Sequence, residues 1–214
     1  MKPHVHAHPS ERHGDFDSWA PSYDKSLLQR VFFDRTHARV VRALRPLLRG
    51  AAAPVVVDVG CGTGRLLSRL RSAFPSASLI GVDAAAGMIE VASRKPELAG
   101  VHLVVASADA LPFEDASCDV VVSTISFHHW SDQAAGLRDV ARVLRPGGNL
   151  VLVDFMTRGA LAPLMRRFGV GHGVGMRTDG ELIGLLHGAS LRAAEQVRVG
   201  PPGSPLGIMV ATRP

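Results

Sequence analysis

Three glycines on alternate positions, between an apolar run and a helical pattern, are the residues of this chain whose spacing first suggests chemistry. They are Gly60, Gly62 and Gly64 in the stretch "VVVDVGCGTGRLLSRL", and Asp58 precedes them. Glycine permits a tight turn and lets the backbone contact a ligand, because no Cβ stands in the way. The helix that follows directs free N–H groups and its positive end toward the same place. The stretch therefore predicts a turn that holds a cofactor.

The spacing of these glycines distinguishes two classes of cofactor. Dinucleotide-binding folds use G-x-G-x-x-G to admit a pyrophosphate at the helix terminus. Here the order is G-x-G-x-G, and Arg65 stands where that pattern has its third glycine. The sequence also offers no catalytic Tyr–Lys pair, so it disfavours a dinucleotide-dependent oxidoreductase.

The elements that must position this turn are short valine-rich runs alternating with helical patterns. The strand-like runs are "VVVDVG", "LIGVDA", "HLVVASA", "CDVVVST" and "NLVLVDF"; the helical ones are "GRLLSRLRSAF", "AAGMIEVASRK" and "SDQAAGLRDVARVL". Continuous apolar runs suit strands buried on both faces of a parallel sheet. We predict an α/β fold: a doubly wound, Rossmann-like, mostly parallel sheet of seven strands with helices on both faces. "LRAAEQVRVG" and "PLGIMVATRP" predict a C-terminal antiparallel hairpin at the sheet edge.

We expect one folded domain at residues 21–214, after a flexible polar tail at residues 1–20. The domain divides into N-terminal helices at 24–49, a cofactor-binding core at 54–154, a lid and acceptor insert at 156–180, and a C-terminal helix and hairpin at 178–213. Alternate glycines in the insert suggest mobility for closure over substrate, although a loop without that role would have the same composition. Apolar residues suggest that the insert accepts an apolar molecule: Phe155, Met156, Leu164, Met165 and Phe168.

The last helix before the insert carries clear boundary signals. It begins at a capping Ser131 or Asp132 and includes Leu144 on its apolar face. We predict that it ends at "RPGG", where Pro146 and two glycines turn the chain into the next strand.

Four segments resemble, in order and spacing, the motifs of class I S-adenosylmethionine-dependent methyltransferases of the type-11, quinone-biosynthesis-like kind. These are "VVVDVGCGTGR", "LIGVDAAAGMIEVA", "SADALPFEDASCDVVVS" and "LRPGGNLVLVD". The resemblance extends over roughly residues 55–154. "FDSWAPSYDKS" is similar to the segment that precedes this domain in quinone-biosynthesis methyltransferases.

The resemblance implies S-adenosylmethionine as the cofactor and gives roles to particular residues. Asp58 would orient the glycine turn and the methionine amino group, and Asp83 would accept hydrogen bonds from the ribose hydroxyls. Asp109 would accept from the adenine amino group, with Leu111 beside the ring, and Tyr23 would cap the pocket. The implied cofactor-binding residues are Tyr23, Asp58, Gly60, Cys61, Gly62, Gly64, Asp83, Ala84, Met88, Ala108, Asp109, Ala110, Leu111, Ser123 and Thr124. Met88 could equally pack in the core.

Two histidines in "STISFHHW" follow the fourth predicted strand. His128 and His129 are candidates for touching substrate or removing a proton, whereas the simpler alternative is that one imidazole packs under the sheet edge beside Trp130. The family resembled has no obligatory catalytic residue, because a base is needed only when the nucleophile arrives protonated. Asp154, at the end of the fifth predicted strand, is a candidate for the substrate side.

Composition and charge limit the other functions. The net charge of +5 invites a nucleic-acid partner, but Arg35, Arg39 and Arg42 fit an ordinary solvated helix face. The histidines of "HVHAH" could chelate a metal, yet a flexible tail explains them better, and we predict no metal site. Two cysteines, and no secretory or membrane-spanning segment in the sequence, favour a cytoplasmic protein.

The sequence thus predicts a methyltransferase that acts by in-line displacement on a small organic acceptor. A nucleic-acid or protein methyltransferase is the alternative enzyme, although "STISFH" replaces the N/D-P-P-Y/F motif of amino-group methylation in nucleic acids. A homologue that binds the cofactor without turnover is the non-enzymatic alternative. The acceptor, the methylated atom and the oligomeric state are not specified by the sequence.

Overall fold

A computed structural model describes residues 27–157, 176–198 and 206–214 of the chain. Its helices are α2 (Leu27–Leu47), α3 (Arg65–Ala73), α4 (Ala86–Ser93), α5 (Gln133–Val143) and α7 (Asp179–Gly188), with short 3-10 helices η1 (Pro96–Leu98) and η2 (Phe127–His129). Its strands are β1 (Val55–Val59), β2 (Ser78–Asp83), β3 (His102–Val105), β4 (Cys118–Thr124), β5 (Leu144–Thr157), β6 (Arg177–Thr178), β7 (Arg192–Arg198) and β8 (Leu206–Thr212).

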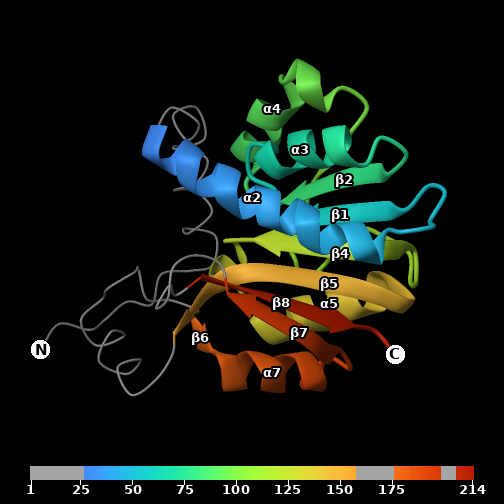
Figure 1. The fold of residues 1–214 in the computed structure, drawn as a ribbon, viewed down its shortest axis with the longest axis vertical. Coiled ribbons are helices and arrows are strands. Elements are labelled where there is room, and N and C mark those ends of the chain that lie inside the picture. The colour runs from blue at the N-terminus through green and yellow to red at the C-terminus, as the bar shows by residue number, and fades with distance from the viewer. Residues whose placement is uncertain (1–26, 158–175, 199–205) are drawn as a thin grey trace, which may run out of the picture.

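The strands form one sheet in the order β3-β2-β1-β4-β5-β8-β7, and the short β6 pairs with β5 (Figure 1). The pairs from β3 through β5 are parallel, whereas β8 is antiparallel to both β5 and β7. The predicted doubly wound sheet with a C-terminal antiparallel hairpin is therefore confirmed. It has eight strands rather than seven, because β6 adds two residues beside the end of β5.

The order of the strands creates a switch point between β1 and β4. From β1 the chain proceeds outward through β2 and β3, then returns to the other side of β1 for β4 and β5. Ligands of open α/β sheets bind beyond the carboxyl ends of the strands at such a point. The turn after β1 and the loop after β4 lie at this end of the sheet.

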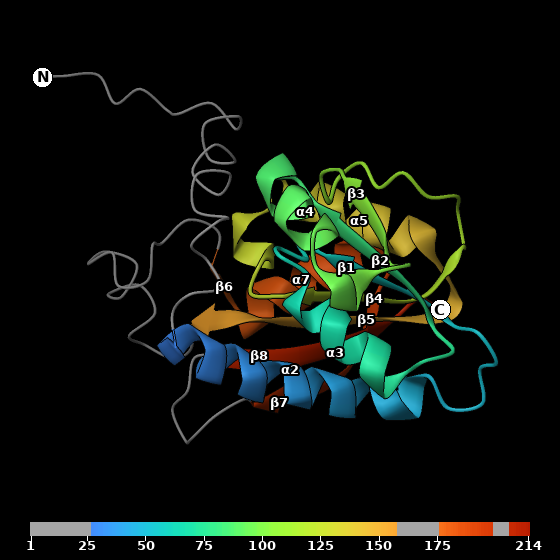
Figure 2. The same ribbon diagram turned by 90° about the horizontal axis from the view of Figure 1, so that it is seen from above.

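Each face of the sheet is covered by its own apolar cluster, and Figure 2 shows the sheet between its helices. One cluster joins the sheet to α2 and α3 through Val40, Leu44, Leu66 and Leu67, which are all buried. The other joins it to α5 and α7 and includes Leu137, Val140, Leu182 and Leu186. The central strands β1 and β4 are buried on both faces, which explains their continuous apolar runs.

The sequence predicted the start of α5 correctly and its end wrongly. Asp132 is the cap, and its Oδ1 accepts a hydrogen bond from the Ala135 backbone N–H at 2.9 Å. The helix ends at Val143, and Leu144, predicted on its apolar face, already pairs with Cys118 of β4. The next pair joins Val120 to Asn149, so "RPGG" forms an irregularity inside β5.

Several predicted segments lie outside the described residues. These are the tail at 1–20, Tyr23, most of the insert at 156–180 and the turn between β7 and β8. Among the helices that the structure does describe, none is both long and apolar enough to cross a bilayer.

Candidate functional site

Two properties explain the glycines in the turn after β1: their backbone conformation and the space around each of them. All three adopt left-handed conformations, with φ of 74° at Gly60, 54° at Gly62 and 78° at Gly64. A Cβ on Gly60 would lie 1.8 Å from the Ser126 side-chain oxygen, so the close approach at this position is to the protein itself. A Cβ on Gly62 would meet nothing within 4 Å. Of these three positions, Gly62 is the one that leaves room for a ligand.

The turn is fastened to β2 by backbone and carboxylate hydrogen bonds. The backbone N–H groups of Gly60 and Cys61 both donate to the Val82 carbonyl, at 2.8 and 3.0 Å. The Gly62 N–H donates to Asp83 Oδ2 at 2.8 Å, and Asp83 Oδ1 accepts from the Ala85 N–H at 2.9 Å. Each carboxylate oxygen has a further lone pair, so Asp83 keeps acceptor capacity for a ligand.

Asp58 lies directly beneath this turn and is 2% exposed. No hydrogen bond to its carboxyl group is found among the described residues. Burial, and then the nearby charge of Asp83, raise the pKa of Asp58 to about 8. A buried carboxyl group without a donor is costly, so this position favours a ligand that brings a cation or an N–H group.

The end of β4 carries two more buried polar groups without partners. Asp58 lies opposite Val122 in the β1–β4 register, so Ser123 and Thr124 continue just beyond its level. The hydroxyl oxygens of Ser123 and Thr124 are buried and make no hydrogen bond. These two unpaired hydroxyl groups lie near the buried Asp58 at the switch point, which suits a polar ligand.

Helix α5 holds the segment "SADALPFEDASCDVVVS", the third of the four motifs found in the sequence. The Leu111 N–H donates to Asp139 Oδ2 at 2.6 Å, and Arg142 donates to the carbonyls of Leu111 and Phe113 at 2.9 and 2.7 Å. Burial would raise the pKa of Asp139, but hydrogen bonds from Arg142 and the Leu111 backbone hold it below its usual value. Leu111 is thereby fixed and buried beside the sheet.

The remaining residues predicted to bind cofactor divide between core and surface. Met88 is buried against Ala85 and Val91, which matches the packing alternative for this residue. Asp109 and Ala110 are exposed, and Ala84 and Ala108 are half-buried. Burial, followed by the charges of Asp58 and Asp83, raises the pKa of the Cys61 thiol well above its usual value, so this cysteine is no nucleophile.

The two histidines after β4 have different surroundings. His128 Nδ1 lies 2.6 Å from Asp154 Oδ1, and the His128 backbone N–H donates to Asp154 Oδ2 at 3.0 Å. His129 is exposed, and its ring centroid lies 3.9 Å from that of His128. Trp130 packs edge-on against Phe127 and donates from its ring N–H to Ser126 Oγ at 3.1 Å.

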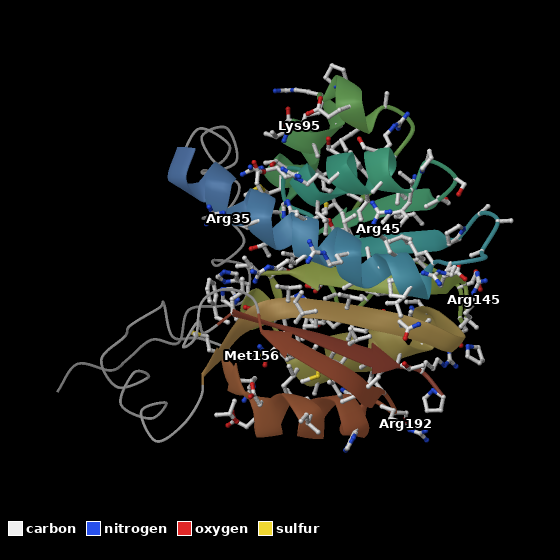
Figure 3. The ribbon with its side chains drawn as sticks, in the orientation of Figure 1. Arg35, Arg45, Lys95, Arg145, Met156 and Arg192 are labelled. Carbon is white, nitrogen blue, oxygen red and sulfur yellow. The ribbon has the colours of Figure 1, made fainter. Side chains whose placement is uncertain are left out.

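Two features of this region differ from the sequence analysis. Met156, expected to line the acceptor pocket, is 2% exposed and belongs to the core between β5 and α7. Figure 3 shows it where β5 leaves the sheet, at the end opposite Arg145. Asp154 had been noted only as a candidate for the substrate side, and its pairing with His128 was missed. The signal in the sequence was Asp154 itself, an acidic residue on β5. This strand is adjacent to β4, which precedes the two histidines.

The comparisons with known proteins concern the family of the chain. Residues 57–152 match the family model described as "Methyltransferase domain". The chain is 35% identical over 142 residues to the demethylmenaquinone methyltransferase of Thermus thermophilus, a match that covers 65% of this chain and 64% of that protein. It is 37% identical over 119 residues to the malonyl-[acyl-carrier protein] O-methyltransferase of Hahella chejuensis, covering 56% of this chain and 43% of the relative.

A solved structure shares the fold of this chain. A SAM-dependent methyltransferase from Aquifex aeolicus superposes with a TM-score of 0.68 at 20% identity, over 92% of this chain and 98% of that one. The match of residues 57–152 to a methyltransferase domain agrees with the resemblance to type-11 methyltransferases found in the sequence. The chain spans less than two thirds of the length of the two curated relatives described.

Proposed function

We propose that this protein is an S-adenosylmethionine-dependent methyltransferase that acts on a small organic acceptor. The observation that carries the proposal is the buried Asp58, which lacks a hydrogen-bonding partner among the described residues and precedes the open Gly62 position by four residues. Its environment suits a ligand with a cationic amino group, which S-adenosylmethionine possesses.

The residues at the switch point fit this cofactor by their donor and acceptor types. Asp58 and the hydroxyl groups of Ser123 and Thr124 would hold its methionine end, and Asp83 would accept from its ribose hydroxyls. Asp109 and Leu111 would face the adenine. When bound, S-adenosylmethionine supplies an electrophilic methyl group on a sulfonium. The protein's part is to align an acceptor with that methyl group and to exclude water.

The acceptor class is supported by the names of the relatives. One is named for demethylmenaquinone and the other for a malonyl group on acyl carrier protein. Both names describe small organic groups as acceptors, so we place the acceptor of this chain in that class rather than among nucleic acids. Two free, buried cysteines support the cytoplasmic location predicted for the protein.

Calorimetric titration with S-adenosylmethionine, compared with NADPH, tests the cofactor. We expect micromolar binding of S-adenosylmethionine only. Asp83→Ala should weaken that binding by about 10- to 150-fold, because a hydrogen bond to a charged group contributes about 1.5–3 kcal/mol. The exposed Glu114→Ala variant is the matched control and should bind normally.

A screen with the radiolabelled methyl donor then tests the acceptor class. We expect label on a naphthohydroquinone or another small acceptor. Label found only on RNA or on protein side chains, or equal binding of NADPH and S-adenosylmethionine, would contradict the proposal.

A further inference from the structure

Asp154 accepts three hydrogen bonds from its own neighbourhood. Its Oδ1 lies 2.6 Å from His128 Nδ1 and also accepts from the Phe155 backbone N–H at 2.6 Å. Its Oδ2 accepts from the His128 backbone N–H at 3.0 Å. The carboxyl group is 3% exposed and acts throughout as an acceptor, which is the behaviour of an ionised carboxylate.

This arrangement determines the tautomer of the His128 ring. Because the carboxylate accepts, Nδ1 must carry the proton and donate it to Asp154. In the neutral ring Nε2 then has a lone pair, and it has no hydrogen-bonding partner among the described residues. The imidazole is held by Nδ1 and left able to receive a proton at Nε2, which is the arrangement of a positioned general base.

The pair lies beside the proposed cofactor site. His128 belongs to η2, the single turn that follows β4, and Asp154 lies on the adjacent β5. The Ile125 N–H donates to the Val153 carbonyl at 2.7 Å, which ties the start of this loop to β5. Ser126, two residues before His128, is the residue that approaches Gly60 most closely. The chain therefore brings the histidine and the glycine turn to the same end of the sheet.

We propose that His128 is the general base of the methyl transfer, that Asp154 is its positioning residue, and that the acceptor is a weakly acidic O–H group, or a carbon activated by one, protonated at neutral pH. The inference rests on the proposed function. In the step, the acceptor loses its proton to His128 Nε2, and its electron pair forms the bond to the methyl carbon. The methyl–sulfur bond breaks with its electrons on sulfur, which becomes a neutral thioether.

This acceptor class excludes one of the two groups named for the relatives. A free carboxylate, such as that of a malonyl group, is already ionised at neutral pH and needs no base. A hydroquinone hydroxyl is protonated and benefits from one. The titratable groups that face the His128 ring among the described residues are Asp154 and His129, and Phe155 packs edge-on against it at 5.9 Å.

The matched variants are His128→Asn and His102→Asn. The asparagine amide can donate to Asp154 from about the place of Nδ1 but has no counterpart of Nε2, so His128→Asn keeps the structural contact and removes the base. His102→Asn makes the same change at an exposed position at the start of β3. Asp154→Asn removes the charge that fixes the tautomer.

The first measurement needs no acceptor. In ¹⁵N-histidine-labelled protein at pH 8, the ring signal lost in His128→Asn identifies His128, and we expect it to show a protonated Nδ1 and a bare Nε2. Asp154→Asn should abolish this preference. A wild-type His128 with its proton on Nε2 would overturn the inference.

The second measurement is single-turnover methylation of a naphthohydroquinone and of a malonyl thioester. We expect the hydroquinone to react, with a rate about 10²-fold lower in His128→Asn, loss of the rising limb of the pH profile, and unchanged cofactor affinity. His102→Asn should react normally. A His128→Asn rate within threefold of wild type, or methylation of the carboxylate alone, contradicts the inference. Failure of the wild type to bind S-adenosylmethionine would instead reject the proposed function.

Discussion

Asp58 is the residue of the proposed site whose burial is least favourable in free energy. It is the fourth residue of the otherwise apolar strand β1, and it is nearly inaccessible and without a hydrogen-bond donor among the described residues. The raised pKa, about 8, means that the carboxyl group is largely protonated near neutral pH without ligand. A cationic group placed beside it would favour the ionised form, so ligand binding and proton release should be linked.

Cofactor binding is therefore expected to release a proton near pH 6.5. Calorimetry in two buffers of different ionisation enthalpy would measure this as a difference in apparent heat, and the affinity should rise as the pH approaches 8. In Asp58→Asn, which keeps the shape but cannot ionise, the buffer dependence should disappear and the affinity should fall. The same buffer dependence in Asp58→Asn and wild type would assign the proton to another group.

For single residues, the sequence predicted where a side chain lies in the sheet better than which other side chain it contacts. Asp58 and Asp83 could be proposed because each lies at or next to the end of a recognisable strand, and parallel strands bring their carboxyl ends to one edge. The His128–Asp154 pair could not, because it depends on the β4–β5 register and on the turn that follows Thr124. Met156 was misassigned because an apolar residue near a strand end fits a pocket and a core equally well.

At the scale of elements, the turn after β1 is positioned against the loop after β4. Gly60→Ala should lower the free energy of unfolding by about 2 kcal/mol or more, because it adds a clash with Ser126 to a left-handed φ. Urea denaturation measures the change. Adding Ser126→Gly should recover the steric part and leave the conformational part.

The control for this prediction is Gly184→Ala in α7. A Cβ there would meet nothing within 4 Å, and the residue is exposed within the helix. This substitution should raise the free energy of unfolding by up to about 1 kcal/mol. If Gly60→Ala were as stable as Gly184→Ala, the close approach of the two loops would be wrong.

Helix α5 positions the segment around Leu111 through Arg142. The guanidinium group bonds to Asp139, to Asp115 and to the Leu111 and Phe113 carbonyls, and the two carboxylates raise its pKa. Arg142→Met removes these bonds while keeping an aliphatic chain.

We expect faster amide hydrogen exchange across residues 109–117 in Arg142→Met, and cofactor affinity about 10-fold weaker because Leu111 is no longer held. Exposed Arg138→Met on the same helix is the control. Unchanged exchange in residues 109–117 would mean that the segment is held by packing alone.

The elements themselves were largely readable from the sequence. Every strand-like run became a strand, since valine-rich runs bounded by glycine or proline have few alternatives at that length. The end of α5 was misread because "RPGG" is a strong stop signal, whereas pairing of Leu144 with Cys118 already starts β5 before it. Pairing between distant segments prevailed over the local signal.

At the scale of the whole molecule, α2 covers one face of the sheet and divides its residues by face. Val40 and Leu44 are buried, whereas Arg35 and Arg45 are exposed on the outer surface (Figure 3). Of the three arginines predicted on a solvated face, Arg35 and Arg42 are exposed and Arg39 is half-buried. The unexpected residue on the inner face is His37, which is buried beside Phe33 with Nδ1 lacking a partner. Burial, and then the charges of Arg65 and Arg69, lower the pKa of His37 to about 4.

Asp58 and His37 make the free energy of unfolding depend on pH in opposite directions. Between pH 3.8 and about 8 the folded state binds more protons at Asp58 than the unfolded state, so stability falls as pH rises through that window. Between about pH 4 and 6.5 the unfolded state binds more protons at His37, so stability rises with pH. The two contributions oppose each other below pH 6.5, and above it only Asp58 acts.

Without cofactor, the free energy of unfolding should therefore change little between pH 4.5 and 6.5 from these two groups and fall from pH 6.5 to 8. Urea denaturation across this range measures it. In Asp58→Asn the free energy of unfolding should no longer fall above pH 6.5 and should rise with pH below it. In His37→Leu it should fall with rising pH from about pH 4 onward. The slopes decide the test, because each substitution also shifts the absolute stability. A wild-type slope above pH 6.5 that persists in Asp58→Asn would show that the buried carboxyl group beneath the glycine turn is not the group that titrates.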